Sequence, residues 1–251
     1  MKRFMVVTAI FLVVFVAAVS LAKHTDLNND SNSHMEETLP DRESVINSLQ
    51  ESDPPASSPT EYTQHTDTVS QDILLVNADN PLPENYTPES LVKLYDQKGR
   101  HFQLATADIE VCKTVFDAMD TMFAAAQKDG VDGFIITSGY RSYEKQAEVF
   151  ADSPSGIAAE PGKSEHETGL AFDVTAYGNE SFEMTSQYEW LSEHCAEYGF
   201  IIRYPKGKEV ITGIPFEPWH YRYVGTPYAK EIMDMGVTLE EYLEWQKSGE
   251  Y

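Results

Sequence analysis

Two histidines and an aspartate are the residues of this sequence best suited to bind a metal ion. His166 and Asp173 lie in the segment 164–173, SEHETGLAFD, which runs from a loop into an expected strand. His220 ends the segment 217–220, EPWH, at the start of another expected strand. Two neutral imidazoles and one carboxylate suit zinc and leave its fourth position open, as catalytic zinc sites do. We therefore expect His166, Asp173 and His220 to bind one zinc ion per chain.

A hydrolytic zinc site also needs a group that accepts a proton, and Glu217 is the nearest such residue to His220 in the sequence. Zinc lowers the pKa of water and polarises a carbonyl, so a neighbouring carboxylate completes the chemistry of hydrolysis. Taken singly, each residue has a structural alternative, because a histidine before a strand is often structural and Asp173 could cap a turn. The His-Glu-x-x-His motif of many zinc proteases is absent from the sequence.

The other histidines and the two cysteines are less suited to such a site. Cys112 and Cys195 fall on apolar faces of expected helices, where a free thiol behaves as a small hydrophobic group. Export from the cell would allow the two to pair, so a disulfide stays open at this stage. Three histidines lie in a polar linker, one in a polar turn and one among glutamates in an expected helix: His24, His34 and His65; His101; His194.

The segment 164–173 has the pattern Ser-x-His-x-x-Gly-x-Ala-x-Asp, and there the sequence resembles the zinc D-alanyl-D-alanine carboxypeptidases of the VanY type. The segment 217–220 matches a second signature of that family, Glu-x-x-His. The segment 138–142, SGYRS, followed by Gln146, matches a third. All three occur in family order, and the resemblance covers roughly residues 73–235. The first signature is specific, whereas Glu-x-x-His alone is a weak signal.

The resemblance implies a role for each matched residue. The two histidines and the aspartate would bind zinc, and Glu217 would be the general base and then the proton donor. Arg141 would bind an anion or stabilise an oxyanion, because a guanidinium can hold a carboxylate with two hydrogen bonds or stabilise charge on the scissile carbonyl. The alternative for Arg141 is a surface ion pair with Glu144. Three further residues would contact substrate: Ser138, Gln146 and Ser164.

Helix and strand signals alternate irregularly after residue 73, which predicts an α+β fold with a small antiparallel sheet and packed helices. The resemblance implies the same fold, which the family shares with hedgehog-type domains. An apolar stripe at helical spacing predicts a helix over 109–128, capped by Asp108. Other helices are expected at 142–150, at 186–198 after a Ser186–Glu189 capping box, from Thr226-Pro227, and after a Thr238–Glu241 capping box. Strands are expected at 134–137, 170–174, 200–204 and 219–224.

The first residues of the chain are typical of an exported protein. Lys2 and Arg3 precede an apolar run over residues 4–22, and a basic flank before such a run is the signature of export. The run approaches the ~20 residues that span a bilayer. We therefore favour a membrane anchor over a cleaved signal peptide, although residues 20–22, SLA, offer a small-residue cleavage site.

The chain divides into three expected parts: a signal or anchor over 1–22, a disordered acidic linker over 23–70, and a peptidase domain over 71–251. The linker is rich in Ser, Thr, Asn, Asp and Glu and has one aromatic residue, so it cannot bury enough apolar surface to fold. Lys and Arg total 18 against 41 Asp and Glu, a formal charge of -23. That balance argues against nucleic acid and against docking on anionic lipids, which leaves the N-terminal segment as the membrane contact.

The expected function is zinc-dependent hydrolysis of the C-terminal peptide bond of peptidoglycan stem peptides, with release of D-alanine, in the bacterial cell envelope. Relatives with the same signature that cut L,D bonds of tetrapeptide stems are one alternative, and loops at 152–163 and 206–215 would set that specificity. A D-Ala-D-Ala dipeptidase is disfavoured, because export removes the chain from free dipeptide. A non-catalytic, zinc-stabilised peptidoglycan-binding module is another alternative, against which Glu217 argues, since binding requires no base.

Overall fold

The computed structural model describes residues 73–83, 86–153, 158–178 and 181–249. All of them belong to one compact unit, within residues 64–251. The expected N-terminal anchor and acidic linker lie outside the described residues, as do their boundaries. Among the described residues, none of the helices combines the length and apolar character that crossing a bilayer requires.

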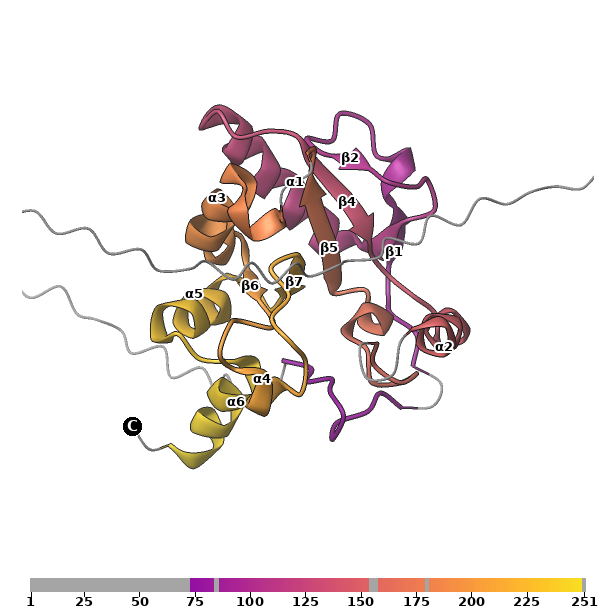
Figure 1. Cartoon of the computed structure of the whole chain (residues 1–251), viewed down its shortest axis with the longest axis vertical. Coiled ribbons are helices and arrows are strands. Elements are labelled where there is room, and N and C mark those ends of the chain that lie inside the picture. The colour runs from indigo at the N-terminus through magenta and orange to yellow at the C-terminus, as the bar shows by residue number, and fades with distance from the viewer. Residues whose placement is uncertain (1–72, 84–85, 154–157, 179–180, 250–251) are drawn as a thin grey trace, which may run out of the picture. The chain divides into compact units, whose positions relative to one another are not determined.

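A five-stranded sheet lies at the centre of the described domain, with the strand order β2-β4-β5-β7-β6 (Figure 1). Strand β2 pairs in parallel with β4, and the other neighbours are antiparallel. Two further strands, β1 and β3, form a small antiparallel sheet. The α+β class is confirmed, but the main sheet is mixed and not wholly antiparallel. The strands are β1 (Leu91–Lys93), β2 (Gln103–Leu104), β3 (Glu110–Cys112), β4 (Phe134–Ser138), β5 (Ala171–Ala176), β6 (Phe200–Ile202) and β7 (His220–Tyr223).

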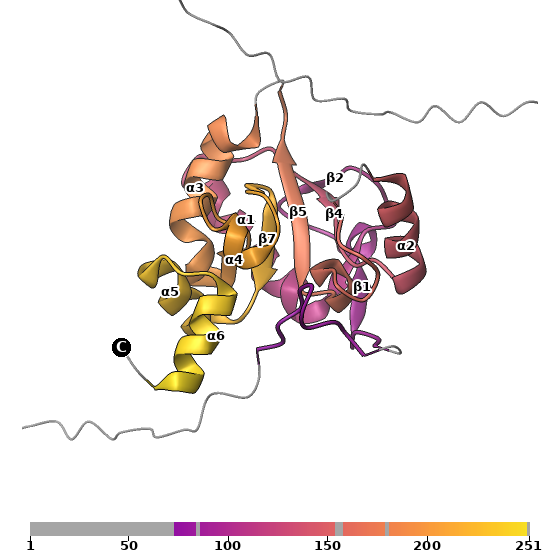
Figure 2. The ribbon, with the colours of Figure 1, turned by 60° about the horizontal axis from the view of Figure 1, so that its bottom comes forward.

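Helices pack around the main sheet in separate groups. Helix α2 lies on the side of the sheet where β4 is, whereas α5 and α6 lie together on the opposite side, beyond β6 and β7 (Figures 1 and 2). The α-helices are α1 (Lys113–Lys128), α2 (Tyr143–Asp152), α3 (Ser186–His194), α4 (Glu209–Thr212), α5 (Thr226–Met235) and α6 (Leu239–Ser248). Short 3-10 helices are η2 (Leu94–Asp96), η3 (Glu165–Thr168), η4 (Phe182–Met184) and η5 (Cys195–Tyr198).

Local capping signals placed three of the helices correctly. The Ser142 side chain accepts a hydrogen bond from the backbone N–H of Lys145 and so begins α2. Helix α5 begins at Thr226 with a proline in its first turn. Helix α6 has the predicted capping box, in which Thr238 and Glu241 satisfy each other's backbone N–H groups. These signals succeed because both partners of each cap lie within one turn of the chain.

The predicted start of the first long helix is wrong. Asp108 caps no helix, and residues 110–112 form strand β3, paired with β1 in a register that sets Leu91 opposite Cys112. Val111 is fully buried there. Pairing with a strand some twenty residues earlier outweighs the local helical pattern, which continues correctly along α1. The first of the six residues of the expected stripe, Cys112, lies in β3 and not in the helix. The other five lie on α1 and are buried: Val115, Met119, Met122, Phe123 and Ala126.

The predicted capping box at Ser186 is also wrong. Thr185 caps α3, because its side chain accepts a hydrogen bond from the backbone N–H of Tyr188. The helix ends at His194 and a 3-10 turn continues to Tyr198. Gly199, with a φ of 87°, then ends the turn as predicted.

The hydrophobic core lies between α1 and one face of the main sheet. The ring of Phe123 on α1 lies 4.6 Å from that of Phe134 on β4 and 6.1 Å from that of Phe172 on β5. Both cysteines of the chain, Cys112 and Cys195, are buried and unpaired, so the open question of a disulfide is answered. Because side chains alternate along a strand, the neighbours of Phe172 on β5 point to the opposite face of the sheet.

The connection from β4 to α2 passes very close to the backbone of β3. A Cβ at Gly139 would lie 2.3 Å from the carbonyl oxygen of Glu110. The next residue, Tyr140, donates its backbone N–H to that same oxygen over 2.6 Å. Only glycine allows this approach, which fixes the position of the segment that carries Arg141.

Gly139→Ala should therefore destabilise the domain by about 3 kcal/mol, because a backbone oxygen cannot move aside as a flexible side chain can. Gly99→Ala is the matched control: Gly99 has a φ of 76° but open space around it, so it should lose only about 1 kcal/mol through backbone strain. Urea unfolding of the two variants measures the difference. Equal losses of unfolding free energy in the two variants would show that the backbone near Gly139 shifts to accommodate a Cβ without additional cost.

Candidate active site

The strand register places three polar side chains in one row. Asp173 on β5 lies opposite His220 on β7, and Ser138 on β4 lies opposite Asp173 from the other side. Residues directly opposite each other in antiparallel strands share a face of the sheet. The adjacent pair, Phe172 and Tyr221, stacks at 5.8 Å between ring centres and belongs to the core. Ser138, Asp173 and His220 therefore lie on the face of the sheet away from the core.

His166 reaches this row from the 3-10 helix η3, which precedes β5. The buried carboxylate of Glu167 holds the start of η3 by accepting backbone N–H groups from Gly162 and Ser164. The His166 Nδ1–H donates to the carbonyl oxygen of Gly139 over 2.7 Å. The other ring nitrogen, Nε2, is thereby left facing Asp173 Oδ1 at 3.3 Å. The hydrogen bond to Gly139 thus selects which nitrogen His166 presents to the site.

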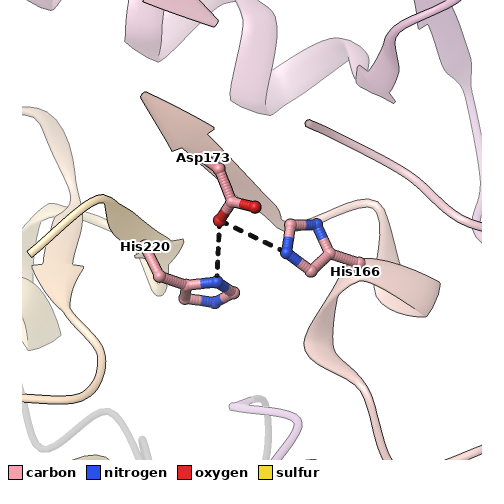
Figure 3. Close-up of side chains that lie close together, drawn as sticks. All are labelled: His166, Asp173 and His220. Carbon is pink, nitrogen blue, oxygen red and sulfur yellow. Dashed lines mark hydrogen bonds and ion pairs between the residues drawn. The ribbon is translucent and has the colours of Figure 1, made fainter. Parts of the chain in front are cut away.

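His166, Asp173 and His220 converge on one point. Their ligand atoms all lie within 4.8 Å of one another, and both imidazoles approach the same carboxylate oxygen of Asp173 (Figure 3). The distance from His220 Nδ1 to Asp173 Oδ1 is 3.1 Å. Two imidazole nitrogens and one carboxylate oxygen are a donor set that fits zinc. The structure thus brings the three expected ligands together, and metal binding by them stays a prediction.

A fourth residue of the site, Glu165, was missed by the sequence reasoning. Its carboxylate is fully buried and lies 3.4 Å from His220 Nε2. It accepts a hydrogen bond of 2.7 Å from Arg203 and another of 2.7 Å from Arg222. Burial opposes its ionisation, but the two guanidinium groups hold the pKa of Glu165 well below its usual range. Its partners lie 38 and 57 residues away in the chain, so no local pattern signals this contact.

The two imidazoles of the site differ in their affinity for protons. Burial disfavours a charged His220, but hydrogen bonds to Asp173 and Glu165 outweigh burial and raise its pKa to about 9. For His166, burial prevails and the pKa is lowered, which keeps the ring neutral near pH 7. The neighbouring histidines hold the pKa of Asp173 well below its usual range in spite of burial.

Glu217 lies beside the three expected ligands but does not belong to their cluster. Its Oε2 atom is 3.9 Å from His220 Nδ1. A turn closed by the hydrogen bond from the His220 N–H to the Glu217 carbonyl brings the two residues together. Burial raises the pKa of Glu217 to about 7, and the nearby charge of Asp173 adds to this effect. A carboxyl group with this pKa can both accept and donate a proton near neutral pH.

Arg141 points into the same site and forms no surface pair. Its Nη2 atom lies 3.6 Å from Asp173 Oδ2. It donates to Gln146 Oε1 over 2.9 Å and to the Ser138 hydroxyl over 3.2 Å. These contacts hold the guanidinium within the site, so the alternative pairing with Glu144 is not the arrangement observed.

A pocket of about 230 Å³ contains these groups. Ser138 is the one expected site residue that does not line it, and it reaches the pocket only through its hydrogen bond with Arg141. Trp219 is 40% exposed at the pocket, and Tyr204 is buried there. The lining includes Arg141, Gln146, Ser164, His166, Asp173, Tyr204, Ile214, Glu217, Trp219 and His220.

Comparison with known proteins agrees with this geometry. The model of the VanY family, described as D-alanyl-D-alanine carboxypeptidase, matches residues 108–226. The carboxypeptidase relative YodJ of Bacillus subtilis is 42% identical over 68% of this chain and 67% of its own length. The D-alanyl-D-alanine carboxypeptidases of Enterococcus faecium and Enterococcus faecalis are 34% and 38% identical, each over 70% of this chain. This chain spans only 58% and 66% of their lengths.

Solved structures point to the same family. The LD-carboxypeptidase LdcB is 41% identical, with a TM-score of 0.61 over 68% of this chain and 84% of its own. A VanY D,D-pentapeptidase mutant in complex with Zn(II) is 38% identical, with a TM-score of 0.56 over 67% and 97%. VanYB in complex with D-alanine-D-alanine is 37% identical, with a TM-score of 0.57 over 68% and 96%. The chain therefore belongs to the VanY family of D-alanyl-D-alanine carboxypeptidases. The expected family, fold and peptidase class are confirmed.

Zinc binding to the full chain should release at least one proton near pH 8, from His220. His220, with a pKa of about 9, is then protonated, and a histidine must be neutral to bind a metal. The apparent zinc affinity should therefore fall at least about tenfold for each pH unit below 9. Calorimetric titration in two buffers with different ionisation enthalpies measures the number of protons released when zinc binds. A binding heat that is the same in both buffers would contradict this assignment.

Proposed function

We propose that this enzyme is a zinc-dependent D-alanyl-D-alanine carboxypeptidase that hydrolyses the C-terminal peptide bond of peptidoglycan stem peptides. The observation that carries the proposal is the gathering of His166, Asp173 and His220 in one pocket with Glu217 and Arg141. The Zn(II) complex of the related VanY structure supports zinc as the metal. The stoichiometry we propose is one zinc ion per chain.

Each pocket residue has a separate chemical task in this proposal. Zinc held by the three ligands supplies Lewis acidity, polarising the scissile carbonyl and making water acidic near neutral pH. Glu217 accepts the proton of the attacking water as the new C–O bond forms, then transfers it to the leaving amine as the C–N bond breaks. The products are free D-alanine and a shortened stem peptide.

Arg141 is proposed to hold the anionic part of the substrate. A guanidinium offers several N–H donors in one plane, which suits the terminal carboxylate of the peptide or the developing oxyanion. Its hydrogen bonds to Gln146 and Ser138 keep it extended toward Asp173. We therefore assign Gln146 and Ser138 to positioning Arg141, and Ser164 to the pocket wall.

The similarity to the LD-carboxypeptidase LdcB supports a second candidate function. This function is the removal of D-alanine from tetrapeptide stems by cleavage of an L,D bond. Both reactions use the same catalytic groups, so the pocket chemistry alone fits either. Incubating the full chain with stem pentapeptide and tetrapeptide, with products identified by mass, separates them. We expect D-alanine from the pentapeptide. Release from the tetrapeptide alone would favour the L,D reading.

Glu217→Gln should reduce D-alanine release by at least about 100-fold, because glutamine keeps the size of the side chain but cannot accept a proton. Zinc content and peptide binding should stay near normal, since Glu217 is not among the three proposed ligands. Glu193→Gln, which neutralises an exposed carboxylate away from the pocket, is the control. Turnover of Glu217→Gln at the rate of the unchanged enzyme would place the base elsewhere.

Arg141→Lys should affect both the Michaelis constant and the turnover number. Lysine keeps the positive charge but loses the planar arrangement of donors that contacts Gln146, Ser138 and the substrate. Steady-state kinetics on the pentapeptide should show a raised KM together with a lowered kcat. A variant with KM and kcat both unchanged would show that Arg141 neither binds the substrate nor takes part in turnover.

We propose that the enzyme acts outside the cytoplasm, since its family acts on peptidoglycan, and that residues 1–22 anchor it to the membrane. Protease added to intact cells stripped of their wall should then release an active soluble fragment by cutting within residues 23–70. Activity detectable only after the cells are lysed would contradict this location. A soluble enzyme in the medium without protease would instead indicate a cleaved signal peptide.

A further inference from the structure

Glu165 contacts the side of His220 that faces away from the other ligands. His220 Nδ1 lies 3.1 Å from Asp173, toward the expected metal position, whereas Nε2 lies 3.4 Å from Glu165 Oε2. Glu165 does not line the pocket, and its side chain is fully buried. It therefore cannot touch substrate and can act on the site only through His220.

A chain of buried ion pairs fixes the Glu165 carboxylate. Its Oε1 atom accepts hydrogen bonds of 2.7 Å from both Arg203 and Arg222, which are themselves buried. Arg203 is held in turn by two hydrogen bonds of 2.6 and 2.8 Å to Glu240 on α6. Arg222 donates over 2.6 Å to the carbonyl oxygen of Leu74. The carboxylate thus has neither rotational freedom nor access to water.

The charges of this cluster determine what Glu165 can do for His220. A carboxylate in contact with two guanidinium groups is ionised, and an ionised carboxylate only accepts hydrogen bonds. Its partner His220 must then carry hydrogen on Nε2, which leaves the lone pair of the neutral ring on Nδ1. Metal-binding histidines commonly donate their second N–H to a carboxylate in this way, which fixes both the ring orientation and the tautomer.

We propose that Glu165 is the positioning residue of the metal site, which locks His220 in the orientation and tautomer that present Nδ1 to the ion. The proposal rests on the zinc function argued above and adds to it a residue outside the pocket. It also gives α6 a role, because Glu240 immobilises Arg203, which in turn immobilises Glu165. No contact between α6 and substrate is needed for that role.

The test measures zinc affinity of the metal-stripped full chain by competition with a chromophoric chelator. Glu165→Gln should lower the affinity about 10–100-fold, the usual effect of losing an outer partner of a metal-binding histidine. Glu241→Gln is the control: Glu241 is a neighbouring carboxylate on α6 that pairs with Lys208 and contacts no member of the Glu165 cluster, so its zinc affinity should stay close to that of the unchanged protein. Nitrogen NMR of zinc-loaded protein should show His220 bound through Nδ1 with a protonated Nε2, and a loss of that signature in Glu165→Gln.

A second variant separates positioning from stability, since removing one partner of a buried ion pair is itself destabilising. The quadruple variant Glu165→Met, Arg203→Met, Arg222→Leu, Glu240→Gln removes the charges of the cluster together, and such replacements of a whole buried ion-pair network often restore stability. We expect it to fold and still bind zinc about 10–100-fold more weakly than the unchanged protein. Normal zinc affinity in this variant, or in folded Glu165→Gln, would overturn the positioning role while leaving the zinc function intact.

Two further outcomes are decisive. Failure of both variants to fold without metal would make Glu165 a requirement of the fold and overturn the proposal. Absence of zinc binding by the unchanged chain would instead overturn the proposed function itself. The two failures are thus distinguishable, because only the second affects the unchanged protein.

Discussion

The pairing of Asp173 with His220 across strands β5 and β7 is the constraint on which the rest of the site depends. Side chains alternate along a strand, so a slip of one residue would turn both groups into the core and bring aromatic rings to the pocket. The stacking of Phe172 on Tyr221 against α1 opposes that slip. The same packing that stabilises the core therefore also sets the geometry of the polar face.

Burial of so many charges on that face requires compensation from elements remote in sequence. Glu165 lies on η3, and Arg203 directly follows β6. Arg222 lies on β7 and Glu240 on α6. Each charge has a partner within 2.7 Å, so the cluster avoids the several kcal/mol that an unpaired buried charge would cost. Helix α6 is thereby tied to the site although it lies away from the pocket. The C-terminal helix α6 thus helps to fix the positions of Arg203 and Glu165 behind the site.

The sequence predicted the parts of this structure that depend on neighbouring residues. Caps at Ser142 and Thr238 were predicted correctly because both partners lie in one turn, and the signature residues came together as the family resemblance implied. The start of α1 was predicted wrongly because β3 forms by pairing with a strand some twenty residues earlier. Glu165 was missed for the same reason: nothing near it in the chain reveals Arg203 and Arg222, whose contacts arise only from the tertiary fold.

The most direct test of the zinc centre is a crystal structure of the zinc-loaded enzyme, with the metal located by anomalous scattering at the zinc absorption edge. We expect a single zinc ion bound by His166 Nε2, a carboxylate oxygen of Asp173 and His220 Nδ1, at about 2.0–2.2 Å from each. The His220 Nε2 should stay within hydrogen-bonding distance of Glu165. A zinc ion found elsewhere, or bound through His220 Nε2, would show that the three ligands are assigned wrongly.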